Sequence, residues 1–234
     1  MSGRWRLAVG LAGLWLLACG GLVVAGWPSY WRYIASEQTP MTWLQSVVLV
    51  VAGCASALVA LLVVRVDGRA ASRPWWLLAV GFGGLTLDER FALHERVRDG
   101  YLAPRGVTVP FLPWVAPGDF VLMVIALAGL AVLPPVWRGV RGDVWARRAL
   151  ALGVTLAVVA VGLDSVDPST WSMAQERLQQ SVEEMIELGS GLALLSAVLL
   201  RMVSVLARLV PASTSASTSA STSLPEASWA AVRG

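Results

Sequence analysis

The sequence predicts an all-α, polytopic membrane protein folded as a bundle of six transmembrane helices. Of its 234 residues, 56% are hydrophobic and 14% are charged, whereas a typical soluble domain has about 25% charged residues. The mean hydropathy is +0.67. Six apolar segments follow one another along the chain, and each is long enough to cross about 30 Å of hydrocarbon as a helix.

The first three helices are delimited by residues that interrupt apolar runs. The first is expected over 7–26, because Pro28 follows it directly. The second is expected over 43–64, shortly before the turn-forming Gly68. The third is expected over 75–95 and carries charged residues in its last two turns.

The last three helices follow a loop rich in proline. The fourth is expected over 119–137, where Pro134-Pro135 should end or kink it early. The fifth is expected over 147–164 and the sixth over 182–206. Six spans place both termini on the same side of the membrane.

Three further segments have their own character. Prolines and aromatic residues predict that 100–118 is an ordered loop at the level of the headgroups. Polar residues at helical spacing predict an amphipathic helix over 171–187 that continues into the sixth span. Residues 1–210 thus form the membrane domain. The Ser/Thr/Ala-rich segment 211–234 is expected to be a disordered cytoplasmic tail, because such a polar repeat cannot bury an apolar core.

The arginines predict the orientation. One set of helix ends carries eleven of them: Arg4, Arg6, Arg65, Arg69, Arg73, Arg138, Arg141, Arg147, Arg148, Arg201 and Arg208. The opposite ends carry six: Arg32, Arg90, Arg96, Arg98, Arg105 and Arg177. Cytoplasmic ends collect arginine, so both termini are expected to be cytoplasmic and the protein to lie in the cell (cytoplasmic) membrane.

Carboxylates from three helices are predicted to lie at the same depth. At 1.5 Å per residue, Asp88 stands about 20 Å, Asp164 about 24 Å and Glu187 about 21 Å from the inner ends of their helices. We therefore expect these three to share a cavity near the outer surface. Charged groups inside a bilayer are costly, which makes this layer a candidate functional site. Its members are Asp88, Glu89, His94, Glu95, Asp164, Glu183, Glu184 and Glu187.

Small residues beside the acids predict close approach of the helices that carry them. They are Gly81, Gly83, Gly84, Gly162, Gly189 and Gly191.

The acidic layer has three interpretations. Carboxylates with one imidazole suit a divalent metal such as iron, zinc or manganese, and all eight residues of the layer are candidate ligands. The second interpretation is a structural or hydrated polar cluster, in which Arg90 and Arg96 neutralise some of the acids. The third is a path for protons or cations.

Two short motifs resemble a known family pattern. Asp88-Glu89, four further residues and His94-Glu95, together with the later Glu183-Glu184 and Glu187, resemble a pattern of uncharacterised bacterial multi-pass membrane proteins. The resemblance covers two helices and implies no known activity.

Three functions are consistent with the sequence. The first is a metal-dependent enzyme acting on a lipid or apolar substrate, with Glu184 or Glu187 as acid/base. The second is a proton- or cation-coupled transporter, and the third a non-catalytic membrane subunit. Membrane lipids are the expected partners, and the sequence leaves a homo-oligomer or a partner membrane protein open. No P-loop, GxGxxG or strongly basic stretch is present, so no nucleotide or nucleic acid is expected.

Overall fold

The computed structural model describes residues 3–36, 38–115, 117–118, 120–166 and 170–209, and they are all-α. Within them lie eight α-helices: α1 (Gly3–Gly26), α2 (Trp31–Ile34), α3 (Pro40–Asp67), α4 (Arg69–Phe91), α5 (Leu93–Val97), α6 (Val121–Gly139), α7 (Val144–Asp164) and α8 (Met173–Leu209). A turn of π-helix (Arg98–Leu102) and one of 3-10 helix (Ala103–Arg105) follow α5. The predicted tail, 211–234, lies outside the described residues.

Five helices are long and apolar enough to cross a membrane: α1 from Trp5 onward, α3, α6, α7 and α8. The chain is therefore a multi-pass membrane protein. The remaining predicted span, the third (75–95), corresponds to α4, which does not reach the same hydropathy. Its 23 residues begin with Arg69 and Arg73 and end with Asp88, Glu89 and Arg90, so charged groups occupy both ends.

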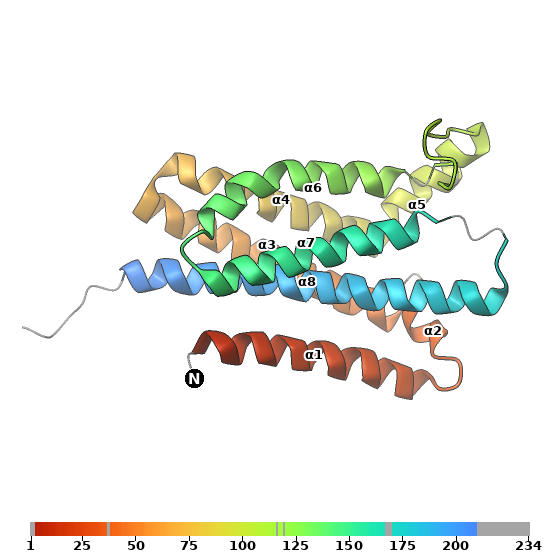
Figure 1. The fold of residues 1–234 in the computed structure, drawn as a ribbon, viewed down its shortest axis with the longest axis horizontal. Coiled ribbons are helices and arrows are strands. Elements are labelled where there is room, and N and C mark those ends of the chain that lie inside the picture. The colour runs from red at the N-terminus through yellow and green to blue at the C-terminus, as the bar shows by residue number, and fades with distance from the viewer. Residues whose placement is uncertain (1–2, 37, 116, 119, 167–169, 210–234) are drawn as a thin grey trace, which may run out of the picture.

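The long helices run alternately up and down beside one another, and α8 lies in the middle of the bundle (Figure 1). The start of α1 and the end of α8 lie at the same end of the bundle. The main core lies where α3, α4, α7 and α8 meet, around Val59, Trp75, Leu150 and Leu195. By contrast, Val136 is the buried residue of α6, so this helix covers the bundle without being enclosed.

Helices α7 and α8 approach closely at a glycine that the sequence analysis did not single out. A Cβ atom built on Gly153 would lie 2.7 Å from Leu194 Cγ, and Ser190 donates a hydrogen bond of 2.9 Å to the Gly153 carbonyl. Gly189 and Gly191 were predicted to allow close packing. A Cβ atom on Gly189 would lie 3.2 Å from Trp15 Nε1, and one on Gly191 would lie 3.2 Å from Val48 Cγ1. Gly81, Gly83, Gly84 and Gly162 have nothing within 4 Å, so the prediction was wrong at these four positions.

Two helix boundaries differ from the sequence prediction. The third expected helix breaks at Ala92, which adopts φ 48° and ψ 49°, and α5 begins at Leu93. Pro134 and Pro135 do not end α6, which continues to Gly139. Proline has a φ compatible with a helix, and the helix has only one further turn to make after the pair.

The loop between α5 and α6 has turns of its own in its described part. Val107 accepts a hydrogen bond of 3.0 Å from the Gly118 amide, and its own amide donates to the Leu102 carbonyl at 3.2 Å. The predicted amphipathic helix before the last span is the first part of α8, which is continuous from Met173 to Leu209.

Candidate functional site

Three elements bring acidic side chains to one end of the bundle: the junction of α4 and α5, the end of α7, and the first half of α8 (Figure 1). This end is opposite to the one at which α1 starts and α8 finishes.

Asp88 and His94 form the first part of the site. The Asp88 carboxylate accepts a hydrogen bond of 2.8 Å from the His94 backbone amide, and its second oxygen lies 2.9 Å from His94 Nδ1. Because Ala92 is left-handed, the chain turns back and presents the first amides of α5 to the carboxylate. Asp88 thus serves as a cap for α5, whose initial N–H groups have no partner within the helix. The same contacts fix the orientation of the imidazole.

The Asp88–His94 pair has a defined electrostatic environment. Burial of the imidazole disfavours its charged form and is the largest single influence on it. The hydrogen bond and charge of Asp88, with the charges of Asp164 and Glu95, together outweigh burial and raise the pKa of His94 above its usual value. With Nδ1 engaged, Nε2 is the ring nitrogen left for a second interaction.

Asp164 connects this pair to α8. It is the last residue of α7, its charge acts on His94, and its carboxyl group is hydrogen-bonded to that of Glu183. Gln179 holds the two helices in register, because its amide donates to the Leu163 carbonyl at 3.0 Å and to Glu183 Oε2 at 2.8 Å. Two carboxyl groups that share a hydrogen bond require a proton between them.

Glu184 and Glu187 meet α3 through Gln45, which is only 4% exposed. Gln45 Nε2 lies 2.9 Å from Glu184 Oε2, 3.1 Å from the Glu184 carbonyl oxygen and 3.4 Å from Glu187 Oε2. The other amide atom, Gln45 Oε1, is buried and has no hydrogen-bond partner in the described part of the chain. A buried acceptor beside two carboxyl groups matches a donor carried by a protonated acid.

Two predicted residues lie toward the edge of the site. Glu95 pairs with Arg98 Nη2 at 3.3 Å, and Arg98 Nε also pairs with Asp99 Oδ1 at 2.7 Å. Glu89 follows Asp88 on α4 and is half-buried. The term acid network is used below for the inner set: Asp88, His94, Asp164, Glu183, Glu184, Glu187, Gln45 and Gln179.

A cavity of about 320 Å³ adjoins the Asp88–His94 pair. Its wall is otherwise apolar: Gly81, Gly84, Leu85, Leu93, Val97, Val121 and Ile125. Asp164 and Glu187, on α7 and α8, are not among the residues that line it, and the expectation that they share one cavity with Asp88 stays a prediction.

Arg90 and Arg96 do not pair with the acid network, although the interpretation as a structural polar cluster expected them to neutralise some of its acids. Arg90 and Arg96 are both exposed, and neither forms an ion pair within the described residues. Arg177 places its guanidinium 4.5 Å from the centre of the Trp31 ring. The network therefore holds more carboxyl groups than bases.

In the described residues, no group of three or more His, Cys, Asp or Glu side chains is arranged to hold a metal ion. Six of the eight predicted ligands are instead joined in pairs, or through Gln45 and Gln179, and Glu95 pairs with Arg98. Both glutamines were absent from the sequence prediction. Gln179 could have been noted because it precedes Glu183 by one helical turn, and Gln45 because it is an amide within an apolar span.

The family model described as Domain of unknown function (DUF8692) matches residues 6–202. The chain belongs to this family. The match includes all the long helices and every residue of the acid network, so the network lies within the unit that defines DUF8692. No curated protein and no solved structure matches this DUF8692 member.

Proposed function

We propose that α4 is a sixth span and that both termini are cytoplasmic. At 1.5 Å per residue its 23 residues extend about 34 Å, which is enough for a hydrocarbon layer of about 30 Å. The contact between α3 and α4 is more extensive than that of any other pair of helices in the described residues. Arginines at one end and the acid network at the other lower its hydropathy, and neighbouring helices cover the acids.

We further propose that the protein is a proton-coupled transporter of the cytoplasmic membrane whose acid network takes up and releases protons near the outer face. The observation that carries this proposal is the hydrogen bond between the Asp164 and Glu183 carboxyl groups from different helices. Like charges so close cannot both remain ionised in a poorly solvated place. A proton shared there is exchanged with the outside through neighbouring groups.

The neighbours supply further titratable groups for such exchange. The charge of Asp164 acts on His94, and the charges of Asp164 and Glu187 act on Glu183. Each can hold or release a proton, whereas the amide of Gln45 orients Glu184 and Glu187 without titrating. Intramembrane acids arranged in this way are typical of proton relays.

The experiment is infrared spectroscopy of the purified protein in nanodiscs at neutral pH. Wild type should show the carbonyl band of a protonated carboxylic acid, and the band should shift in heavy water. Glu183→Gln and Asp164→Asn should each remove it, whereas Asp99→Asn should not, because Asp99 is exposed and paired with Arg98. Absence of the band in wild type across pH 5 to pH 8, the range in which imidazole ordinarily titrates, would refute proton sharing.

Transport is tested in proteoliposomes that contain a pH-sensitive dye. An imposed membrane potential should drive proton entry in wild type, and entry in Glu183→Gln should fall to the rate of empty liposomes. Asp99→Asn is again the control. If Glu183→Gln conducts as well as wild type, the network is not a proton path.

A metal-dependent enzyme with a lipid or apolar substrate is the second candidate. One observation favours it: Asp88 holds His94 by Nδ1, as carboxylates often hold the imidazoles that bind metals, and leaves Nε2 available. Glu184 or Glu187 would then supply acid/base chemistry. Elemental analysis decides between the candidates, because stoichiometric iron, zinc or manganese in wild type that is lost in His94→Ala and Glu187→Ala would support the enzyme.

A further inference from the structure

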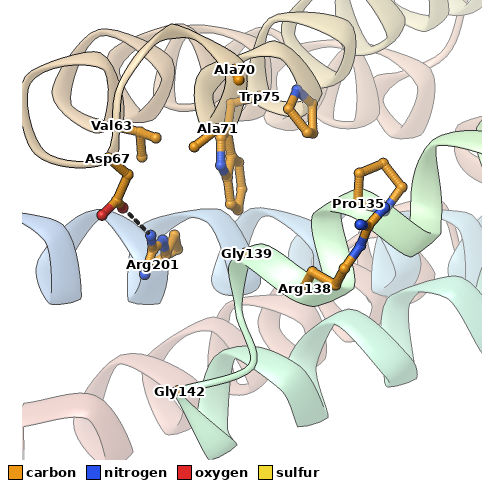
Figure 2. Close-up of a pocket in the computed structure, with 11 residues that line it drawn as sticks. Val63, Asp67, Ala70, Ala71, Trp75, Pro135, Arg138, Gly139, Gly142 and Arg201 are labelled. Carbon is orange, nitrogen blue, oxygen red and sulfur yellow. Dashed lines mark hydrogen bonds and ion pairs between the residues drawn. The ribbon is translucent and has the colours of Figure 1, made fainter.

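A second polar site lies at the opposite end of the bundle, where the arginine-rich ends of α3, α4, α6 and α8 surround a cavity of about 550 Å³. Figure 2 shows Asp67 and Arg201 on one wall, Arg138 and Pro135 on another, and the Trp75 ring projecting between them. This volume lies within the range of about 300–1,000 Å³ that is usual for small-ligand sites.

The cavity is built by close packing at its base. Trp75 is 2% exposed, and a Cβ atom on Gly139 would lie 3.0 Å from Trp75 Cζ2. Glycine therefore allows the end of α6 to pass directly over the indole, which brings Arg138 to the same cavity as Arg201. Four helices thus position the polar groups of this site.

The charges of the cavity do not balance. Arg201 Nη2 lies 3.3 Å from Asp67 Oδ2, but the same carboxylate also binds Arg208, at 2.6 Å and 3.0 Å. Arg201 Nε is buried and has no hydrogen-bond partner in the described part of the chain. Arg138, the second guanidinium on the wall, reaches only the Pro134 carbonyl, at 3.4 Å. The cavity wall therefore carries two arginines and one carboxylate, which it shares with Arg208 outside the wall; the buried Asp143 also acts on Arg201 through its charge.

We propose that this cavity binds a phosphate-bearing anion through Arg201 and Arg138, with Trp75 as its apolar wall. Guanidinium groups match phosphate oxygens in geometry and charge, and Arg201 retains an unused donor for such a bond. Basic pockets between membrane helices on the cytoplasmic side suit lipid headgroups. The wall formed by α6 favours a lipid source over a soluble phosphate compound, because most of this helix is not enclosed by others.

The test uses the full chain in nanodiscs of phosphatidylcholine, alone or mixed equally with phosphatidylglycerol, and counts retained phosphatidylglycerol by native mass spectrometry. Wild type should retain it, and Arg138→Gln and Arg201→Gln should retain several-fold less. Arg141→Gln is the matched control, because it removes one exposed arginine from the same end but not from the cavity wall. Arg138 is also exposed, so its variant keeps the test valid even if Arg201→Gln does not fold.

Inorganic phosphate distinguishes the two sources. In pure phosphatidylcholine nanodiscs, a rise in melting temperature with phosphate that Arg138→Gln abolishes would support the site and point to a soluble ligand. Retained phosphatidylglycerol without a phosphate effect would support the site and point to lipid. Equal loss of phosphatidylglycerol in Arg141→Gln and Arg138→Gln, or no response to either probe, would overturn the proposal.

Discussion

His94 is the only histidine of the chain, and its titration reports directly on the acid network. Burial lowers the pKa of His94, but Asp88, Asp164 and Glu95 outweigh that effect and raise it. Asp88→Asn keeps the shape of the partner and removes its charge. The pKa of His94 should then fall below the wild-type value, because burial is still present. Histidine-selective ¹⁵N NMR of the purified protein resolves this as a single titrating signal. Asp99→Asn should move it much less.

The same shift predicts how stability depends on pH. Since folding raises the pKa of His94, the charged pair with Asp88 stabilises the protein fully below the ordinary histidine pKa of about 6.5. That contribution disappears as the pH rises through the higher pKa of the folded state. Thermal unfolding in detergent should therefore show a loss of stability over that window in wild type. His94→Gln should not show it, and an unchanged pH profile in this variant would contradict the assignment.

At the scale of elements, the break at Ala92 permits a clear test. A left-handed residue with a Cβ costs about 1–2 kcal/mol, and glycine avoids this strain at the expense of a more flexible unfolded chain. Ala92→Gly should therefore be neutral or stabilise the protein by up to about 1 kcal/mol. Ala128→Gly, at an exposed position in the interior of α6, should destabilise by about 1 kcal/mol. Denaturant unfolding in mixed micelles measures both.

The contact between α7 and α8 offers a second pair of variants. Gly153→Ala places a methyl group 2.7 Å from Leu194 Cγ and 3.0 Å from the Leu194 nitrogen, which is backbone and cannot move freely. It should destabilise by about 1–3 kcal/mol. Gly162→Ala on the same helix meets nothing within 4 Å and should be neutral or slightly stabilising. If the two variants have the same free energy of unfolding, α7 and α8 are not as close at Gly153 as described.

These elements also show which features a sequence can predict. Five spans were predictable because each is a long apolar run. The break at Ala92 was not, because alanine is the best helix former and nothing in its own side chain favours the left-handed turn that Asp88 stabilises by capping α5.

For the acid network, the sequence indicates how deep each acid lies but not which side chains it meets. Depth along a helix follows from residue number, so the shared level of Asp164 and Glu183 could be anticipated. Which faces meet depends on helix rotation. Gln45 joins Glu184 across 139 residues of sequence, and nothing local to Gln45 marks that contact. The close contact at Gly153 was missed in the same way, because all glycines in apolar runs look alike in the sequence.

At the scale of the whole molecule, the two sites lie at opposite ends of one bundle. Acids gather where α5 lies and α8 begins, and arginines gather where α3 ends and α4 begins (Figure 1). This separation of charge agrees with the expected orientation, because arginine-rich ends remain in the cytoplasm. The acid network would then face outward and the arginine-lined cavity inward.

Reporter fusions test this orientation and the status of α4 together. Fusions at residues 70, 142 and 225 should report the cytoplasm, and fusions at 36 and 108 the outside. Residue 70 lies at the start of α4 and residue 108 beyond its end, so opposite readings there establish it as a span despite its low hydropathy. Like readings at 70 and 108 would mean that α4 does not cross, and the acid network would lose its predicted access to the outer face. An outside reading at 142 would reverse the model entirely, because Arg138, Arg141, Arg147 and Arg148 give that turn the strongest cytoplasmic signal in the chain.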